Sequence, residues 1–517
     1  MKPIKLSSQR RRKMRTKFVV FVVMVCLFIF SSYVLAQPKG TVTVAVSTDF
    51  MSLDPVGGGY TGTGQMMHRH MAEGLIEFAP DGKMYPRLAT SWKLVDDKTW
   101  RFTLRKGVKF HNGNPFTAAD VKFSIDYLMD PQNKWNYRAL FAGHDGVQII
   151  DDYTIDIKTK APDPVMPTRW ATRVRIFSKK FYDENGNEGL QRQVVGTGPF
   201  KFVSWQRNDR VTMEANTDWY LDPPKIKTAV FRIIPEMGAR VAEWQAGGVD
   251  VIEGIPPFMV PQLKKVPNAE IQSVLGVRAM YMLLDTIKSP ELKDKRVRQA
   301  LNYAVDKEAI IKGVLNGTGT PLGTHVPLRV AGADNSIKPY PYDPEKAKAL
   351  LKEAGYPNGF SIKLFSPNAR YPMDKEVTLA VADQISKVGI KTDVQIMESN
   401  LYLRELAAHN LGGGIYLIGM ASAEWDVDYA LNQLPSNFVL CYYPDKAVDE
   451  MVSNTRTLMD QNKRFESASR IQKFVHDEAL YLFLYNEVRS YGISKRVKGF
   501  EAPGDELMAL WRLSVTD

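Results

Sequence analysis

Several residue patterns have the side-chain types that metal binding or acid–base catalysis uses, but none has the required spacing. His68 and His70 lie two residues apart, and on a helix such residues point to different faces. The seven histidines of the chain are scattered, without the spacing of a metal site. The acidic pairs Asp96-Asp97 and Asp151-Asp152 lie in polar contexts that are typical of hairpin turns. Because a GxxxxGKS/T phosphate loop and a GxSxG nucleophile elbow are also absent, we expect no catalytic residues, no cofactor and no metal site.

The N-terminus has the pattern of an export signal. Residues 18–30 are apolar, and Val34-Leu35-Ala36 is a small-residue cleavage site before Gln37. The preceding segment is basic and has no acidic residue; its charges are Lys2, Lys5, Arg10, Arg11, Arg12, Lys13, Arg15 and Lys17. We expect residues 1–36 to be a cleaved signal peptide and the mature protein to be periplasmic. An uncleaved anchor, or a twin-arginine signal built on Arg11-Arg12, is the alternative.

The charge of the mature chain argues against nucleic-acid binding. The full chain has 68 basic and 57 acidic residues, a net charge of +11. Eight of the basic residues lie in the signal, so residues 37–517 carry 60 basic against 57 acidic residues, a net charge of +3. A nucleic-acid-binding protein needs a basic face for phosphate contacts. Cys26 lies in the signal as well, which leaves Cys441 without a partner for an intramolecular disulfide.

Residues 85–127 predict a β-hairpin followed by a helix. Residues 92–95 and 99–105 alternate apolar and polar side chains, and Asp96-Asp97-Lys98 is the turn between them. Farther on, Thr117 stands as an N-cap with Asp120 three residues later.

Helical and strand patterns alternate in the second half of the chain. Asp343 and Pro344 predict the N-cap and first position of one helix, and residues 374–388 predict another before a strand at 390–394. Residues 296–307 predict an amphipathic helix with Arg296, Arg298, Gln299 and Asn302 on its outer face, and we expect it to serve packing. The alternation favours parallel or mixed sheets covered by helices, an α/β fold.

The segment 85–127 closely resembles the one that marks family 5 extracytoplasmic solute-binding proteins, the peptide/nickel class of ABC-transporter receptors. The shared residues are Leu88-Ala89, Ser91-Trp92, Arg105-Lys106-Gly107-Val108, Phe110-His111, Gly113, Pro115-Phe116-Thr117 and Asp120-Val121. The resemblance covers nearly the whole mature chain, through the glycine-threonine-glycine-proline turn at 195–200 and the segment 296–307.

This resemblance implies a two-lobed, periplasmic-binding-protein-like fold with an extra subdomain in the first lobe. The first lobe would span residues 37–280 and the second 281–480, and residues 481–517 would return to the first. The implied mechanism is ligand capture by hinge closure, followed by docking of a monomer on the permease subunits of an ABC transporter.

The resemblance also implies that a loop of the second lobe, residues 418–431, contacts the ligand. In peptide-binding relatives an aspartate of this loop holds the α-ammonium, for which a carboxylate is the natural partner. One alignment of the loop puts Glu424 in that place, and an ungapped alignment leaves Asp426 as the nearest carboxylate. Both remain open, as does the alternative of a solvated carboxylate. Trp425 stands where relatives often have glycine, as either a stacking surface or a lobe-packing residue.

Three further residues are expected to contact the ligand. Arg370 and Tyr371 belong to a turn that resembles an arginine-tyrosine-proline turn of the family. The planar guanidinium of Arg370 suits a ligand carboxylate, and an exposed arginine or an inter-loop salt bridge is its alternative. Tyr60, in a glycine-rich loop, is the expected first-lobe contact, with an ordinary surface tyrosine as its alternative.

Two classes of function follow. The first is a non-enzymatic receptor that captures a small ligand, above all a peptide, and delivers it to an ABC importer. The second is an exported hydrolase of peptides or polysaccharide, which would need a nucleophile or acid pair in the cleft. Within the receptor class, an oligosaccharide or a metal chelate competes with peptide, because one fold serves many ligands.

Overall fold

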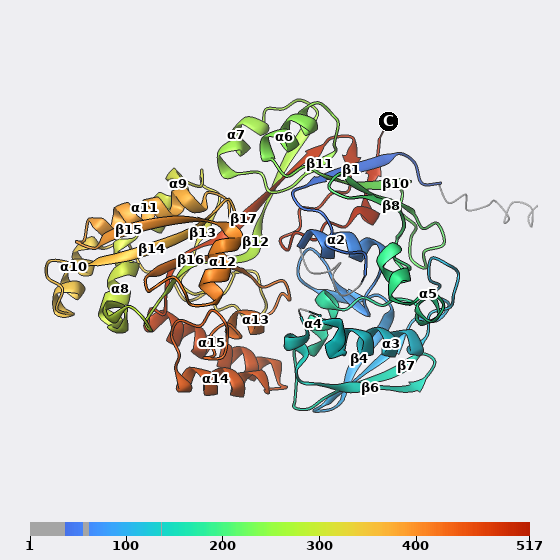
Figure 1. Cartoon of the computed structure of the whole chain (residues 1–517), viewed down its shortest axis with the longest axis horizontal. Helices are drawn as coiled ribbons and strands as arrows, with labels where there is room; N and C mark the ends of the chain where they lie inside the picture. Colours follow the sequence, from blue (N-terminus) through green and yellow to red (C-terminus); the bar gives the residue numbers. More distant parts are fainter. Residues whose placement is uncertain (1–36, 55–61, 136, 517) are drawn as a thin grey trace, which may run out of the picture.

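The computed structural model describes residues 37–54, 62–135 and 137–516. Two lobes lie side by side, the second on the left of Figure 1 and the first on the right. Eleven strands of the described residues form one sheet that continues through both lobes. From the second lobe to the first, the strand order is β15 (Lys391–Glu398), β14 (Ser361–Asn368), β16 (Ile415–Ala421), β12 (Ala269–Leu284), β17 (Tyr481–Ser494), β11 (Val251–Ile252), β1 (Thr41–Val46), β10 (Thr228–Ile233), β9 (Arg210–Ala215) and β8 (Phe200–Gln206), with β13 (Thr320–Pro321) on β17.

Strands β12 and β17 are long enough to belong to both lobes. They pair antiparallel from Ala269↔Ser494 to Leu283↔Tyr481, and their register shifts between Leu275 and Ala279. On the first-lobe side β17 pairs with β11, and on the second-lobe side β12 pairs with β16. The irregular pairing therefore lies where the chain passes between the lobes.

Each lobe has parallel strands whose carboxyl ends can carry a site. In the first lobe β1 pairs parallel with β10 and β11, and in the second β14 pairs parallel with β15 and β16. Helices cover these sheets, as the alternating sequence pattern requires. Those of the first lobe are α2 (Gly62–Met71), α3 (Ala118–Met129), α4 (Met166–Arg173), α5 (Lys179–Arg192), α6 (Met237–Gln245) and α7 (Val260–Leu263). Those of the second are α8 (Lys295–Ala304), α9 (Lys307–Gly313), α10 (Pro344–Glu353), α11 (Asp374–Ser386), α12 (Ser399–Ala407), α13 (Val427–Leu431), α14 (Lys446–Arg456) and α15 (Gln461–Asp477).

The extra subdomain of the first lobe contains the hairpin predicted from the sequence. Its antiparallel sheet has the order β4 (Ala89–Asp96), β5 (Thr99–Leu104), β7 (Thr154–Thr159) and β6 (His144–Asp151). The turn between β4 and β5 confirms the hairpin, and Thr117 is the N-cap of α3, as predicted. The Asp120 carboxylate accepts a 2.9 Å hydrogen bond from the backbone amide of Thr117, which closes the first turn of the helix.

The helices predicted at Asp343 and Asp374 are confirmed, but the prediction for residues 296–307 is partly wrong. The helix α8 ends at Ala304, and Asp306 caps a separate helix, α9. Arg298 and Asn302, predicted to face outward, are 1% and 0% exposed. Arg298 donates hydrogen bonds to the backbone carbonyls of Leu292, Lys293 and Glu478. Buried polar groups of this kind are compatible with a core because each finds a backbone partner.

Candidate ligand-binding site

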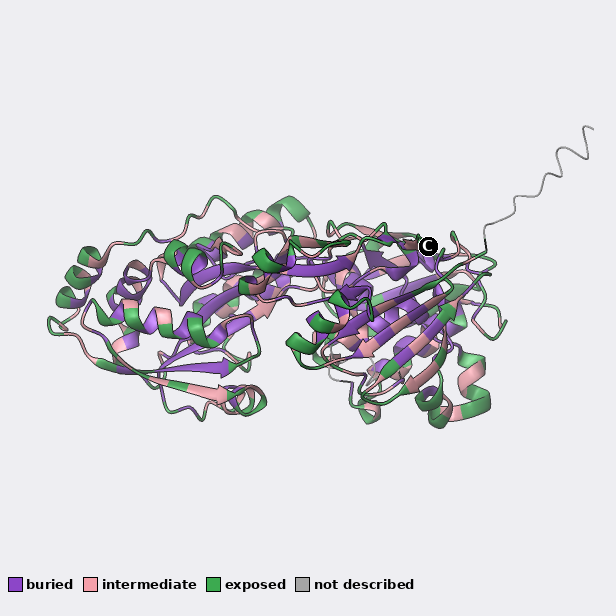
Figure 2. Cartoon of the chain, turned by 90° about the horizontal axis from the view of Figure 1, so that it is seen from above, coloured by how far each residue is buried: buried purple, intermediate pink, exposed green. Residues whose placement is uncertain are grey.

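A cavity of about 760 Å³ lies between the two lobes. Both lobes contribute walls, and the view from above in Figure 2 shows them joined along the long central strands. The first-lobe wall follows the ends of β1 and β11 and the start of α6, while the second-lobe wall is the loop between β14 and α11. Ligands of open α/β sheets bind outside the carboxyl ends of strands, and a volume of roughly 300–1,000 Å³ is usual for small-ligand sites.

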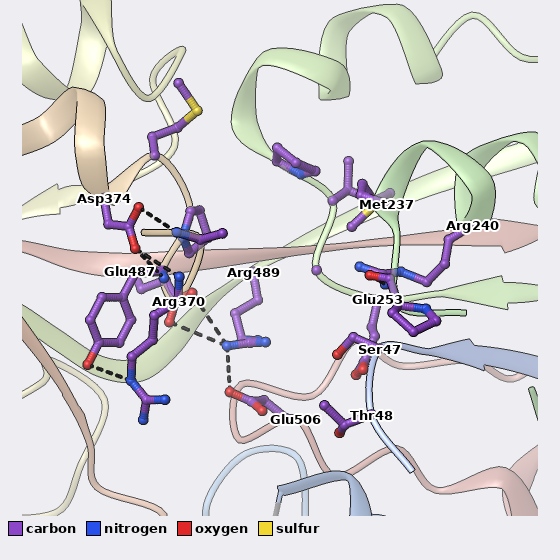
Figure 3. A pocket seen from close by; sticks show the side chains of 18 of the residues that line it. Ser47, Thr48, Met237, Arg240, Glu253, Arg370, Asp374, Glu487, Arg489 and Glu506 are labelled. Carbon is purple, nitrogen blue, oxygen red and sulfur yellow. Dashed lines mark hydrogen bonds and ion pairs between the residues drawn. The ribbon is translucent and has the colours of Figure 1, made fainter. Parts of the chain in front are cut away.

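Asp374 holds the second-lobe wall in shape. Its buried carboxylate accepts hydrogen bonds from the backbone amides of Ala369, Arg370 and Tyr371, at 3.2, 2.8 and 3.1 Å. Burial raises the pKa of Asp374 above its ordinary value, although these amide hydrogen bonds act in the opposite direction. This fixed turn presents the exposed guanidinium of Arg370 to the cavity (Figure 3). Tyr371 is buried beneath it, and its hydroxyl accepts a 3.2 Å hydrogen bond from Arg370 Nε.

The floor of the cavity is a network of four charged residues from three segments of the chain. Arg278 of β12 pairs with Glu487 of β17 at 3.0 Å and with Glu506 at 3.2 Å. Arg489 of β17 pairs with Glu506 at 2.5 Å and with Glu487 at 3.4 Å. Burial alone would raise the pKa of Glu506, but the charges of Arg489 and Arg278 outweigh it and lower that pKa. The network consequently forms a floor in which the charges of two arginines and two glutamates balance.

The sequence-based reasoning missed this network. Glu487 and Arg489 are charged residues in β17, a strand that is otherwise largely buried. Charged residues rarely occupy such positions without partners, so their presence was a usable signal of a polar site.

The first-lobe wall presents a second carboxylate, Glu253, which directly follows β11. Glu253 is 9% exposed and lines the cavity beside Ser47 and Thr48. Burial and the nearby charge of Glu506 raise its pKa to about 7, although Arg489, Arg240 and the backbone amide of Ser47 act in the opposite direction. Arg240 instead donates hydrogen bonds to the backbone carbonyls of Ile234 and Pro235, at 2.7 and 2.8 Å.

The structure brings only part of the sequence-predicted contact set to this cavity. Arg370 and Tyr371 line it, whereas Glu424, Trp425 and Asp426 do not, and Tyr60 lies outside the described residues. Asp426 forms a two-point ion pair with Arg464 of its own lobe, at 2.7 and 2.8 Å. Asp426 is also the N-cap of α13, and its carboxylate accepts a hydrogen bond from the backbone amide of Asp428.

Glu424 and Trp425 instead join the two lobes beside the cavity. Glu424 accepts two hydrogen bonds from Arg173 of α4, at 2.9 and 2.8 Å. Trp425 is 2% exposed, adopts a φ of +53°, and donates its indole N–H to Asp505 at 3.0 Å. Left-handed backbone is uncommon for bulky residues and is adopted most readily by glycine. The ring packs so closely on Gly82 that a Cβ there would lie 2.4 Å from it.

A second ion pair joins the lobes nearby. Arg169 of α4 contacts Asp428 of α13 at 2.9 Å and Asp163 of its own lobe at 2.7 Å. Asp428 is also held by Arg456 of α14, at 2.9 Å. We name Arg169, Arg173, Glu424 and Asp428 the interlobe ion pairs. Their burial means that separating the lobes would expose charges that are now paired with each other.

Comparison with known proteins decides the family. The profile of the bacterial extracellular solute-binding proteins, family 5, matches residues 83–438. The chain belongs to this family. It is similar to the glutathione-binding protein GsiB of Pectobacterium atrosepticum, with 29% identity over 489 residues, 92% of this chain and 94% of the relative.

Solved structures of family 5 proteins have the same fold. The periplasmic binding protein DppA of Helicobacter pylori, in complex with the peptide STSA, has a TM-score of 0.78 and 25% identity, over 93% of this chain and 99% of that one. AgaA of A. tumefaciens R10, in complex with agropinic acid, has a TM-score of 0.76 and 25% identity, over 92% and 99%. The two-lobed α/β fold expected from the sequence is confirmed.

As a family 5 protein, the chain is a receptor that captures a ligand and delivers it to an ABC importer. These relatives are binding proteins, and the H. pylori protein is periplasmic. Within the described residues, no helix combines the length and the apolar character that a membrane span requires.

Proposed function

We propose that the protein captures a short peptide, or a similar small molecule with an amine and a carboxylate, in the interlobe cavity. The observation that carries this proposal is the guanidinium of Arg370, which faces the cavity and has no acidic partner within 4 Å among the described residues. A planar guanidinium binds carboxylates through paired hydrogen bonds. Glutathione and the peptide STSA, the ligands of the relatives above, both carry an amine and a carboxylate.

Capture would proceed by closure of the lobes about strands β12 and β17. We infer a division into residues 37–280, 281–480 and 481–517, with the movement taken up at the irregular pairing near Leu275 and Ala279. The proposed ligand contacts are Arg370 and Tyr371. Glu424, Trp425 and Asp426 would act on affinity indirectly, by holding the closed lobes together and supporting the loop of α13.

We further propose that the protein is a monomer without enzymatic activity. The basic segment at residues 1–36 supports export by a cleaved signal. The mature charge of +3 supports the proposal that the protein does not bind nucleic acid. Incubation with glutathione and STSA is expected to return both ligands intact, as judged by mass spectrometry. Cleaved products that scale with time and protein concentration would instead support a hydrolase.

The ligand class is tested by native mass spectrometry of the mature protein purified from its own host. Gentle denaturation should release a peptide or another ligand that carries both an amine and a carboxylate. Release of an oligosaccharide or a metal chelate would keep the receptor and overturn the peptide assignment.

Arg370→Ala is expected to weaken binding of STSA by roughly 10- to 100-fold, because hydrogen bonds to a charged group contribute about 1.5–3 kcal/mol. The melting temperature should not change, since the Arg370 side chain is exposed and its ring contact with Tyr371 is at the surface of the cavity. Titration calorimetry with STSA and its C-terminal amide measures the effect.

The matched control is Arg192→Ala, which removes an exposed arginine that pairs with Glu188 on α5. It should bind STSA like the unmodified protein. If Arg370→Ala also binds STSA with unchanged affinity, Arg370 is not part of the site.

A further inference from the structure

We propose that Glu253 selects ligands with a positively charged amine, which it binds from the first-lobe wall while Arg370 holds the carboxylate from the second lobe. This inference rests on the proposed function, because it assigns the orientation of the ligand in the same cavity. It makes the ligand a bridge between the two walls, so that its two charges favour the closed lobes over the open ones.

The other acidic residues of the cavity wall are already engaged or open to water. Asp374 binds three backbone amides of its turn, and Glu236 accepts the amide of Ala239 at 2.6 Å as the N-cap of α6. Glu487 and Glu506 are paired with the arginines of the floor, and Glu376 is exposed. Among the described residues, the buried carboxylate of Glu253 has no ion pair within 4 Å, and unlike Asp374 it is not bound by three backbone amides of its own turn.

The surroundings of Glu253 contain cations, but these are bound elsewhere. Arg240 of α6 donates to two backbone carbonyls, and Arg489 of β17 is held by Glu487 and Glu506. The remaining titratable groups near Glu253 are Glu506 and Tyr491, which bring no positive charge. A buried carboxylate without a counter-charge is unfavourable, and a ligand ammonium would supply that charge.

Arg370 is in the opposite situation on the facing wall. Figure 3 shows Arg370 on one side of the cavity and Glu253 on the other, with Arg489 and Glu506 between them. Within the described part of the chain, these two charges of opposite sign have no ion-pair partners, and their places at the two ends of a neutral floor match a ligand with separated amine and carboxylate. A ligand with only one of these groups would leave one wall charge unpaired.

The pH dependence of binding follows from the position of Glu253. Burial, with the repulsion from Glu506, raises its pKa to about 7, so the carboxyl is largely neutral at pH 5.5 and largely charged at pH 7.5. An α-ammonium, with an ordinary pKa of about 7.7–8.0, stays mostly protonated over this range. Affinity for a peptide with a free amine should therefore rise from pH 5.5 to pH 7.5, while affinity for an N-acetylated peptide should not.

The test compares STSA with N-acetyl-STSA by titration calorimetry on the mature protein and on Glu253→Gln. We expect the unmodified protein to prefer the free amine by about 10- to 100-fold, and Glu253→Gln to reduce this preference to within about twofold. Arg370→Ala should keep the amine preference and lose the carboxylate preference. Glu243→Gln, an acid on α6 that is paired with Arg232 outside the cavity, is the matched control.

Folding of Glu253→Gln is checked by its melting temperature. Because the raised pKa makes the native state bind more protons than the unfolded chain, stability from this group falls as pH rises from about 4.5 to about 7. The variant has no such loss, so it should melt at pH 8 no lower than the unmodified protein.

Two outcomes would overturn the inference alone: equal binding of STSA and N-acetyl-STSA by the unmodified protein, or a full amine preference in Glu253→Gln. Failure of STSA and glutathione to bind at all would instead overturn the proposed function, and this inference with it. Amine dependence and peptide binding are thus separate readouts of one experiment.

Discussion

Replacing Glu77 by glutamine is expected to lower the free energy of unfolding by about 3–5 kcal/mol, because it leaves buried arginines without their shared carboxylate. Glu77 is 3% exposed, and it pairs with Arg69 at 2.6 Å and with Arg87 at 2.9 Å. Both arginines are 5% exposed or less, so water cannot replace the lost charge. Urea denaturation followed by tryptophan fluorescence measures the change.

The stabilisation by the Glu77 carboxylate should be lost at low pH. Burial alone would raise the pKa of Glu77, but the charges of Arg69, Arg87 and Arg175 outweigh it and hold the pKa at about 2. Since this value is below the ordinary one, the stabilisation is complete above about pH 4.5 and is lost as pH falls toward 2. The difference in free energy of unfolding between the unmodified protein and Glu77→Gln should therefore be smaller at pH 3 than at pH 7.

The control for Glu77→Gln is Asp126→Asn, which removes one partner of an exposed pair with Lys122 on α3. Such pairs contribute about 0.3–0.5 kcal/mol, so this variant should unfold almost like the unmodified protein. A loss below about 1 kcal/mol in Glu77→Gln would contradict a stabilising role for the buried carboxylate.

Replacing Arg169 and Arg173 together by methionine is expected to open the lobes. In the closed form the change leaves Glu424 buried without its cation and removes one of the two arginines on Asp428, whereas in an open form water can hydrate both acids. Breaking a buried pair costs about 3–5 kcal/mol, enough to shift the ratio of closed to open molecules by roughly 100-fold or more. Small-angle X-ray scattering should report a larger radius of gyration, and STSA affinity should fall with the closed fraction.

Arg464→Met is the control that distinguishes an effect on lobe closure from a general loss of stability. It breaks the equally buried pair with Asp426, but both partners belong to the second lobe. We expect this variant to lose stability while its radius of gyration stays that of the unmodified protein. An unchanged radius of gyration in the double variant would show that the interlobe ion pairs do not control closure.

Local features of the fold were predictable because they depend on neighbouring residues. The β4–β5 hairpin follows from alternation around a polar turn, the starts of α3 and α10 follow from capping residues, and α11 follows from its helical pattern. The prediction for α8 was wrong at Arg298 and Asn302 because helical periodicity assigns polar residues to water. Helical periodicity cannot show that Arg298 donates to the carbonyl of Glu478. It also cannot show that Asn302 donates to the carbonyl of Tyr481, about 180 residues away in the sequence.

Residues of the site were predictable only where they belong to a short, recognisable sequence motif. The turn at Arg370 and Tyr371 was recognisable from sequence, and the structure places both on the cavity wall. The same reasoning could not separate Glu424 from Asp426, since the choice depends on their partners. Those partners are Arg173, 251 residues away, and Arg464, 38 residues away, and no local pattern encodes either pairing.

The sequence by itself determined the family, the expected export signal and the local elements, because dense motifs, charge patterns and turn chemistry are local properties. Only the tertiary structure decided which charges meet. It joined β12, β17 and the C-terminal segment into the paired floor, and among the described residues it left Glu253 and Arg370 without ion-pair partners on opposite walls. Partner choice between distant charges depends on how the sheet and its loops bring them together, and that information exists only in the folded chain.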